Sequence, residues 1–176
     1  EIVYRQAIAL EPNYTEAHYN LGNTLKELGR LDKAEASYRQ VIALNPDYAE
    51  AYNNLAVTLK ELDRLQEAEA SYRQAIIINP DYAQAHSNLG AALQELGRLE
   101  EAEASYRQAI IINPDYVEAY SNLGVALHKL GRLEQAEASF RKAIELNPNF
   151  VKAYSNLGNI LQEISNLEEA EIIYRQ

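Results

Sequence analysis

The sequence predicts an all-α protein built as a linear array of short helical hairpins, and three observations support this prediction. An asparagine followed by leucine recurs every 34 residues, and a fixed period in this range is typical of solenoids. Proline recurs with the same period and marks joints that no helix crosses. Between the joints, apolar residues follow helical spacing. The asparagines are Asn20, Asn54, Asn88, Asn122 and Asn156, and the prolines are Pro12, Pro46, Pro80, Pro114 and Pro148.

The prolines divide the chain into units. Residues 1–11 are predicted to finish a helix, and an incomplete unit closes the chain at 148–176. Because both ends fall within predicted helices and the chain contains no methionine, we expect it to be a piece of a longer array. The complete units are predicted at residues 12–45, 46–79, 80–113 and 114–147.

Each unit is predicted to hold two helices, which in the second unit run from about residue 48 to 62 and from about 66 to 78. Asp47 follows the proline as a candidate N-cap, and Glu50 completes a capping box. The first helix of the first, third and fourth units ends at a glycine, such as Gly29, which suits a left-handed C-terminal turn. Asp63 and Ser165 replace this glycine in the second and fifth units.

This unit resembles the tetratricopeptide repeat, which has 34 residues, two helices, and conserved places for Leu-Gly, alanine, an aromatic residue and proline. The resemblance covers essentially the whole chain, and in the first unit it rests on Leu21, Gly22, Ala34, Tyr38 and Pro46. It implies a right-handed superhelical solenoid in which the first helix of each hairpin lines a concave face. The large aromatic residue that is common early in the first helix is replaced by His18, Tyr52, His86, Tyr120 and Tyr154, and Ala56 stands for the glycine of the second unit.

The asparagines form the strongest candidate binding feature, a row that we call the asparagine ladder. At about 100° per residue, Asn20 lies on the side of its helix opposite Leu21 and Leu25, and its column is constant while its neighbours vary. An amide offers one acceptor and two donors, which suits the backbone of an extended peptide. The ladder resembles the inner surface of the repeat arm of O-linked N-acetylglucosamine transferases. The candidate peptide-binding residues are Asn20, Asn54, Asn88, Asn122, Asn156, Asn23, Asn159, Tyr19, Glu16, Glu27, Glu50, Glu61, Glu95 and Glu118.

Two other interpretations of the ladder stay open. The asparagines can hydrogen-bond one another and order the stack, or they can persist because one ancestral unit was copied. We favour ligand binding because the adjacent column has diverged; it reads Tyr19, Asn53, Ser87, Ser121 and Ser155.

Charge narrows the class of partner. The formal net charge of −10 disfavours nucleic acid, because phosphates would be repelled. The glutamates of the row favour a neutral or basic extended segment, although a simply solvated acidic face explains them equally well. No apolar run is long enough to span a membrane, and we expect the cytoplasm by default.

The sequence contains no recognisable catalytic, cofactor or metal site. It has no cysteine, no phosphate-binding loop and no nucleophile–base arrangement. His18 and His86 occupy the same core-facing place two units apart, too far to share a metal ion, and His128 is predicted to lie alone. We therefore expect no enzyme activity and no cofactor.

Apolar residues outside the predicted core suggest two further contacts. Ile77 and Ile111 stand where the first unit has Ala43, and we expect them to pack between units; if exposed, they form a contact surface. The terminal segments carry Ile2, Val3, Ile172 and Ile173, which predicts head-to-tail self-association.

The function predicted from the sequence is a non-catalytic protein-interaction scaffold that holds an extended peptide on its concave face. One alternative is the substrate-recognition arm of a larger enzyme, such as a protein O-glycosyltransferase. The other is a structural module that self-associates through its ends.

Overall fold

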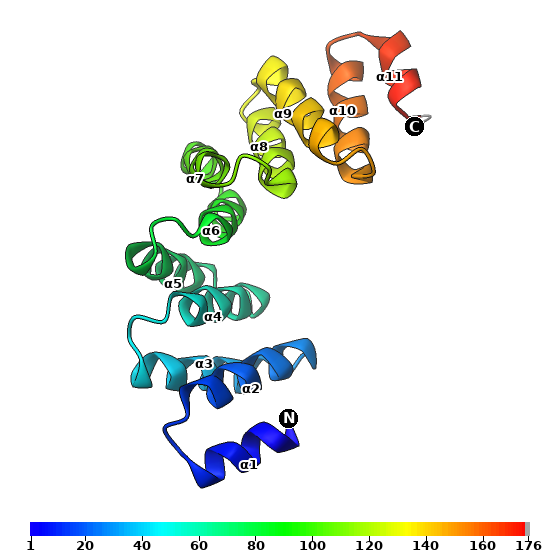
Figure 1. Ribbon diagram of the computed structural model, residues 1–176. Coiled ribbons are helices and arrows are strands. Elements are labelled where there is room, and N and C mark those ends of the chain that lie inside the picture. Colours follow the sequence, from blue (N-terminus) through cyan, green and yellow to red (C-terminus); the bar gives the residue numbers. More distant parts are fainter. Residues whose placement is uncertain (175–176) are drawn as a thin grey trace. The chain divides into compact units, whose positions relative to one another are not determined.

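The computed structural model describes residues 1–174 and is all-α over that range (Figure 1). Arg175 and Gln176, which end the predicted unit 148–176, lie outside the described residues. The helices form two compact units, Glu1–Asn88 and Leu89–Gln176, with the division inside α6. From here on, "unit" means one of these two parts, and each 34-residue segment of the sequence is called a repeat. The described helices are α1 (Ile2–Leu10), α2 (Thr15–Glu27), α3 (Leu31–Leu44), α4 (Ala49–Glu61), α5 (Leu65–Ile78), α6 (Ala83–Glu95), α7 (Leu99–Ile112), α8 (Val117–Lys129), α9 (Leu133–Leu146), α10 (Val151–Glu163) and α11 (Leu167–Tyr174).

Within each unit, helices that follow one another in the chain lie side by side. In the first unit α2 pairs with α3 and α4 with α5, and α3 packs on α4. In the second unit α8 pairs with α9 and α10 with α11, and α9 packs on α10. We call the first helix of each hairpin (α2, α4, α6, α8, α10) an A helix and the second (α3, α5, α7, α9, α11) a B helix. A helices also touch each other directly, α2 with α4 and α8 with α10, and this contact positions the candidate site.

The core of each hairpin forms where an aromatic ring of the B helix meets a small residue of the A helix. Tyr38 and Phe140 are fully buried. A Cβ built on Gly22 would lie 2.7 Å from the Tyr38 ring, and one on Gly124 would lie 2.6 Å from the Phe140 ring. Because real Cβ contacts are longer than this, glycine allows the two helices to approach closely. Gly22 and Tyr38 are among the residues on which the resemblance to the tetratricopeptide repeat rests.

The turn between the paired helices is left-handed, as predicted. Gly29 has a φ of 69°, and Asp63 and Ser165 adopt the same conformation with φ values of 60° and 63°. The Arg30 N–H donates back to the Leu25 carbonyl at 2.8 Å, which satisfies one of the carbonyls left free at the helix end.

The predicted capping box is wrong. The residue before α4 is Tyr48, with no side-chain cap hydrogen bond, so Asp47 lies one position too early. The N–H of Asp47 instead donates to the Asn45 side-chain oxygen at 3.2 Å, and three other joints repeat this pattern at Asn79, Asn113 and Asn147. An asparagine whose side-chain oxygen accepts from the N–H two residues later closes an Asx turn, and this turn satisfies a backbone N–H at the joint.

Candidate functional site

The asparagine ladder occupies one place on successive A helices, and all five side chains are half-buried. The structure divides them into groups with different hydrogen bonds. The constant sequence column conceals this difference.

Asn54 is fully engaged with the preceding A helix. Its Nδ2 donates to the Tyr19 hydroxyl and to the Asn23 Oδ1, both at 3.0 Å. Its own Oδ1 accepts from the Asn53 Nδ2 at 3.2 Å, and the Tyr38 hydroxyl donates to the Asn23 Oδ1 at 2.8 Å. These side chains form one polar network across α2, α3 and α4.

Asn88 repeats part of this arrangement one repeat later. Its Nδ2 donates to the Asn53 Oδ1 at 3.0 Å, and Asn53 is only 1% exposed. The column that contains Tyr19 and Asn53 therefore supplies acceptors to the asparagine of the following repeat. Sequence reasoning took the variation in this column as support for ligand binding and missed its structural role. Asn54 and Asn88 thus form hydrogen bonds between successive A helices, of the kind that the first alternative describes.

The remaining asparagines differ. Among the described residues, the side-chain amides of Asn20 and Asn122 make no hydrogen bond within their units. The Nδ2 of Asn156 is buried without a partner, and so is the Ser121 hydroxyl. Ser121 and Asn156 are spaced in sequence like Asn53 and Asn88, but serine is shorter than asparagine and carries no amide oxygen to accept the bond.

The predicted glutamates of the row are exposed. Over the part of the chain that the structure describes, Glu16, Glu27, Glu50 and Glu61 of the first unit form no ion pair, and neither does Glu118 of the second. By contrast, several ion pairs of the first unit lie on α3, on α5 and just before α5, where Arg64 contacts Glu35 and Glu67, each at 2.7 Å. The other row residues, Glu95 and Asn159, are also exposed.

The unpaired carboxylates have an electrostatic effect on the neighbouring tyrosines. Burial raises the pKa of Tyr48, and the nearby Tyr19, Glu50 and Glu16 raise it further. Burial raises the pKa of Tyr38 more strongly, again with contributions from Tyr19 and from carboxylates of the row. The carboxylate contributions, which are smaller than that of burial, have the sign expected of a negative potential on this face of the first unit.

Tyr19, predicted as a free aromatic side chain for stacking, is held by its neighbours. Its ring stacks on Tyr48 with centroids 5.1 Å apart and an interplanar angle of 29°, and it tilts against Tyr38 at 6.1 Å. Since its hydroxyl also accepts from Asn54, Tyr19 fixes the network and offers a ligand less than the sequence indicated.

The histidines make structural contacts. The Nε2 atoms of His18 and His86 lie 2.9 Å from the carbonyls of Pro12 and Pro80, so each ring is tied to the joint before its own helix. His128 was predicted to lie alone, but its Nε2 is 2.8 Å from a carboxylate oxygen of Glu163 on α10. That prediction failed because the partner is 35 residues away. Within residues 1–174, as far as they are described, no cluster of three His, Asp or Glu side chains could hold a metal ion.

The repeating A and B helices, the ring-on-glycine core and the left-handed turns define the chain as a tetratricopeptide-repeat protein. The chain belongs to the family of the C-terminal domain of cilia and flagella-associated protein 70, whose model matches residues 2–176. Tetratricopeptide domains are typically protein–protein interaction modules and are generally non-catalytic.

Solved structures with the same fold include three repeat proteins. The type IV pilus biogenesis factor PilW has a TM-score of 0.87 and 24% identity, with 97% of this chain and 79% of that chain covered. PilF of Pseudomonas aeruginosa has a TM-score of 0.85 and 24% identity, covering 92% and 73%. YrrB, described as a tetratricopeptide protein with an unusual peptide-binding site, has a TM-score of 0.78 and 23% identity, covering 97% and 88%. At this identity the likeness concerns the fold alone.

A comparison with curated protein sequences gave no match. None of the described helices has the length and apolar character that crossing a membrane requires.

Proposed function

We propose that this chain is a non-catalytic scaffold that binds an extended, neutral or basic segment of a partner protein along the asparagine ladder. The observation that carries the proposal is that the half-buried side-chain amides of Asn20 and Asn122 form no hydrogen bond within their described units. In the first unit, Asn20 lies on the same helix as the unpaired carboxylates of Glu16 and Glu27.

The chemistry of these groups fits a peptide backbone. A peptide group presents one donor and one acceptor, and a free asparagine amide can satisfy both. Unpaired carboxylates on the same face attract Lys or Arg side chains of the bound segment, and they raise its association rate at low ionic strength. The peptide-binding site described for the similarly folded YrrB supports a proposal of this kind.

The structure changes which asparagines should contribute. Asn54 and Asn88 already donate to neighbouring side chains, so a ligand would compete with these bonds. We therefore assign the backbone-binding role to Asn20 and Asn122, and a supporting role to the networked pair.

The test compares three baits in a pull-down read by mass spectrometry. One is the unaltered chain, and the second carries Asn20→Ala and Asn122→Ala. The matched control carries Gln40→Ala and Gln108→Ala, which remove exposed amides from B helices. We expect partners to be recovered by the first and third baits and lost from the second. Equal recovery by all three baits, with circular dichroism showing folded protein, would exclude the ladder as the binding site.

Removing carboxylates provides an independent test, which measures binding of the partner segment identified in the pull-down. Glu16→Gln combined with Glu50→Gln should weaken binding by about two- to tenfold at low salt, and the difference should shrink as salt screens the charges. Isothermal titration at two salt concentrations measures both effects. A segment that binds both proteins alike would contradict the electrostatic part of the proposal.

For the compartment, we propose the cytoplasm and its extension into cilia or flagella, because the matching family is named for those organelles. Fluorescence microscopy of the tagged natural protein tests this assignment, and a signal confined to another compartment would refute it.

A further inference from the structure

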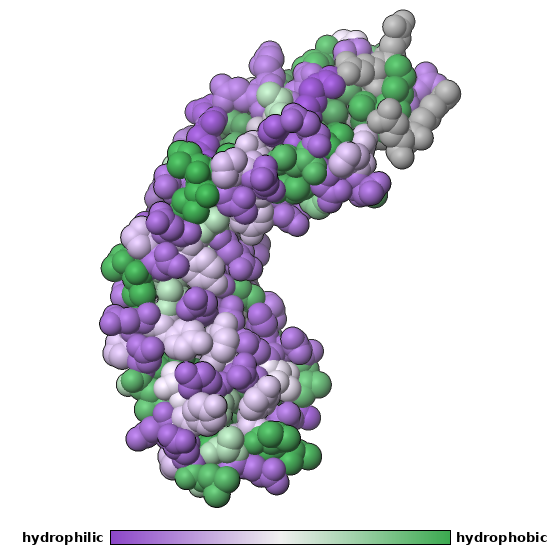
Figure 2. Space-filling model, viewed as in Figure 1, coloured by the Kyte–Doolittle hydropathy of each residue, from purple (hydrophilic) through white to green (hydrophobic). Residues whose placement is uncertain are grey.

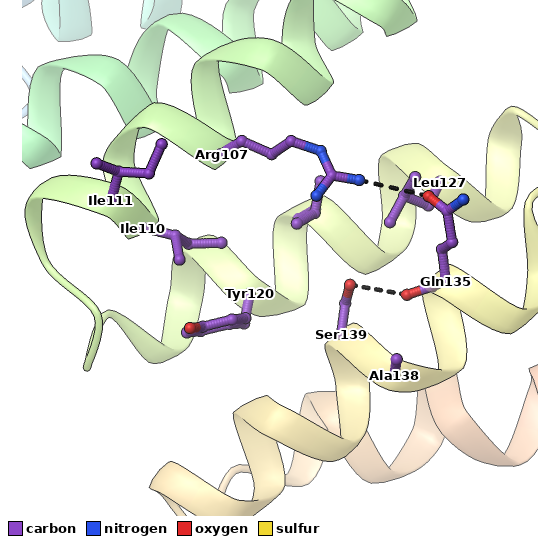
Figure 3. Close-up of a pocket in the computed structure, with 9 residues that line it drawn as sticks. Arg107, Ile110, Ile111, Tyr120, Leu127, Gln135, Ala138 and Ser139 are labelled. Atoms are coloured by element: carbon purple, nitrogen blue, oxygen red, sulfur yellow. Dashed lines mark hydrogen bonds between the residues drawn. The ribbon is translucent and has the colours of Figure 1, made fainter.

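A crevice on the second unit lies away from the asparagine ladder, between α7, α8 and α9 (Figure 3). Its volume is about 620 Å³, and apolar groups dominate its lining, with Ile110, Ile111, Tyr120 and Leu127 among them. Ile111 is 70% exposed, which corrects the expectation that it packs between units. Ile77, its counterpart one repeat earlier, is equally exposed at 71%. Apolar patches of this kind interrupt the mainly hydrophilic face in Figure 2.

The same place recurs one repeat later in a filled form. The second crevice is lined by Arg141, Ile144, Tyr154 and Leu157, each 34 residues after a residue of the first, and its volume is about 250 Å³. Ile173 of α11 lines it at the position that Ser139 occupies in the first crevice. The comparison shows that this site accepts a branched aliphatic side chain, and that small residues on α9 leave the first crevice larger.

Charge also distinguishes the first crevice. In the first unit, the corresponding Arg39 contacts two carboxylates, Glu35 at 2.8 Å and Glu67 at 3.7 Å. At the crevice, Gln135 takes the place of Glu67, and its Oε1 accepts from Arg107 at 3.3 Å (Figure 3).

The carboxylate that remains at the crevice is shared. Glu103 lies 2.9 Å from Arg107 and 2.7 Å from Arg132. Among the described residues, it is the one carboxylate within ion-pair distance of Arg107. The rim of the crevice therefore carries a half-exposed guanidinium that faces an uncharged amide, on a protein whose net charge is −10.

We propose that this α7–α9 crevice is a second protein-docking site, which receives a branched aliphatic side chain of a partner segment together with an adjacent Asp or Glu. The aliphatic side chain fills the volume that Ile173 fills in the next repeat. The carboxylate of the partner pairs with Arg107 on the side of Gln135, where the protein supplies an amide in place of a second carboxylate beside Glu103. The charge preference is opposite to that of the asparagine ladder, so the two sites select different segments.

The test selects random dodecapeptides displayed on phage against the unaltered chain. The selected peptides are then synthesised and titrated into variants. Ser139→Ile fills the crevice from its own wall, as Ile173 does in the next repeat. Ser71→Ile is the matched control, since Ser71 holds the same position on α5 and makes the same hydrogen bond, to the Glu67 carbonyl at 2.9 Å. Each variant is checked by circular dichroism.

We expect the selected peptides to share an aliphatic residue next to Asp or Glu. Ser139→Ile should weaken their binding by about tenfold or more, because the aliphatic side chain loses its burial, and Ser71→Ile should leave it unchanged. Gln135→Glu, an exposed change that restores the carboxylate of earlier repeats, should weaken acidic peptides by about two- to fivefold and leave their Asp→Asn analogues unaffected.

The proposal is overturned if no peptide is enriched, if the enriched peptides lack the aliphatic–acidic pair, or if they bind the Ser139→Ile protein as tightly as the unaltered chain. If Ser139→Ile does not fold, the Gln135→Glu result decides. The bait with Asn20→Ala and Asn122→Ala should bind these peptides normally, so failure of the crevice and failure of the ladder are separate results.

Discussion

Replacing Asn54 by alanine should destabilise the protein far more than the same change at Asn122, although the two residues occupy equivalent places in the sequence. Asn54→Ala removes two bonds donated by its Nδ2 and one accepted by its Oδ1. At about 0.5–1.5 kcal/mol net for each hydrogen bond, the loss lies between roughly 1.5 and 4.5 kcal/mol. We expect about 2 kcal/mol, near the lower end, because Asn54 is half-buried and water can reach some of the freed groups.

Asn122→Ala serves as the matched control. Both changes replace asparagine by alanine in the middle of an A helix, so both gain the same helix propensity of about 0.7 kcal/mol at most. This gain cancels in the comparison. Because the Asn122 amide has no hydrogen bond within its described unit, the stability of that variant should stay within about 0.5 kcal/mol of the unaltered chain or rise slightly.

Urea denaturation followed by circular dichroism measures the difference. With a slope of about 2 kcal/mol per molar urea, the midpoint of Asn54→Ala should fall about 1 M below that of Asn122→Ala. Equal midpoints for the two variants would refute the reasoning, since they would show that the network across α2 and α4 contributes no net stability.

Three other changes test the remaining parts of the structure. Ser121→Asn should supply the acceptor that the buried Asn156 amide lacks and raise the free energy of unfolding by about 1 kcal/mol; a lower urea midpoint would show that the site has no room. Gly124→Ala places a Cβ about 2.6 Å from the Phe140 ring and should cost about 1–2 kcal/mol after the gain in helix propensity, whereas an unchanged midpoint would mean that the ring moves aside freely. The pKa of Glu67 is lowered by the guanidinium that donates to it, so its contribution is present above the unfolded-state pKa and is lost as pH falls through the lower folded value. The stability gap between the unaltered chain and Glu67→Gln should therefore close below about pH 4, and a gap that persists at pH 2 would assign it to something other than charge.

The sequence was sufficient to predict the helices and their pairing because the signals are local. Each proline ends a helix, and each residue at the left-handed position marks a turn, even where Asp63 or Ser165 replaces glycine. The start of the A helix in the second repeat, predicted at about residue 48, lies at Ala49 for a physical reason. Asn45 competes for the N–H of Asp47 through an Asx turn, and Asp47 then lies outside the helix.

The hydrogen bonds of the ladder could not be predicted because their partners lie on another repeat. Asn54 reaches Tyr19 across 35 residues, and only the packed helices bring the two together. The crevice depends in the same way on side-chain volumes contributed by three helices. The sequence did contain one signal for these hydrogen bonds, because the column that contains Tyr19 and Asn53 varies beside the constant asparagine column. The sequence interpretation took this variation as divergence without function.

The column that contains Tyr19 and Asn53 supplies hydrogen-bond acceptors to the following repeat, and this has a consequence when repeats are rearranged. The state of an asparagine is set by the preceding repeat, through Tyr19 or Asn53 in one case and Ser121 in another. Deleting, duplicating or shuffling a repeat would therefore alter the chemistry of its successor without changing one letter of that successor's sequence. The hydrogen bonds of each repeat therefore depend on the repeat before it, and a design that recombines repeats must keep compatible pairs of neighbouring repeats together.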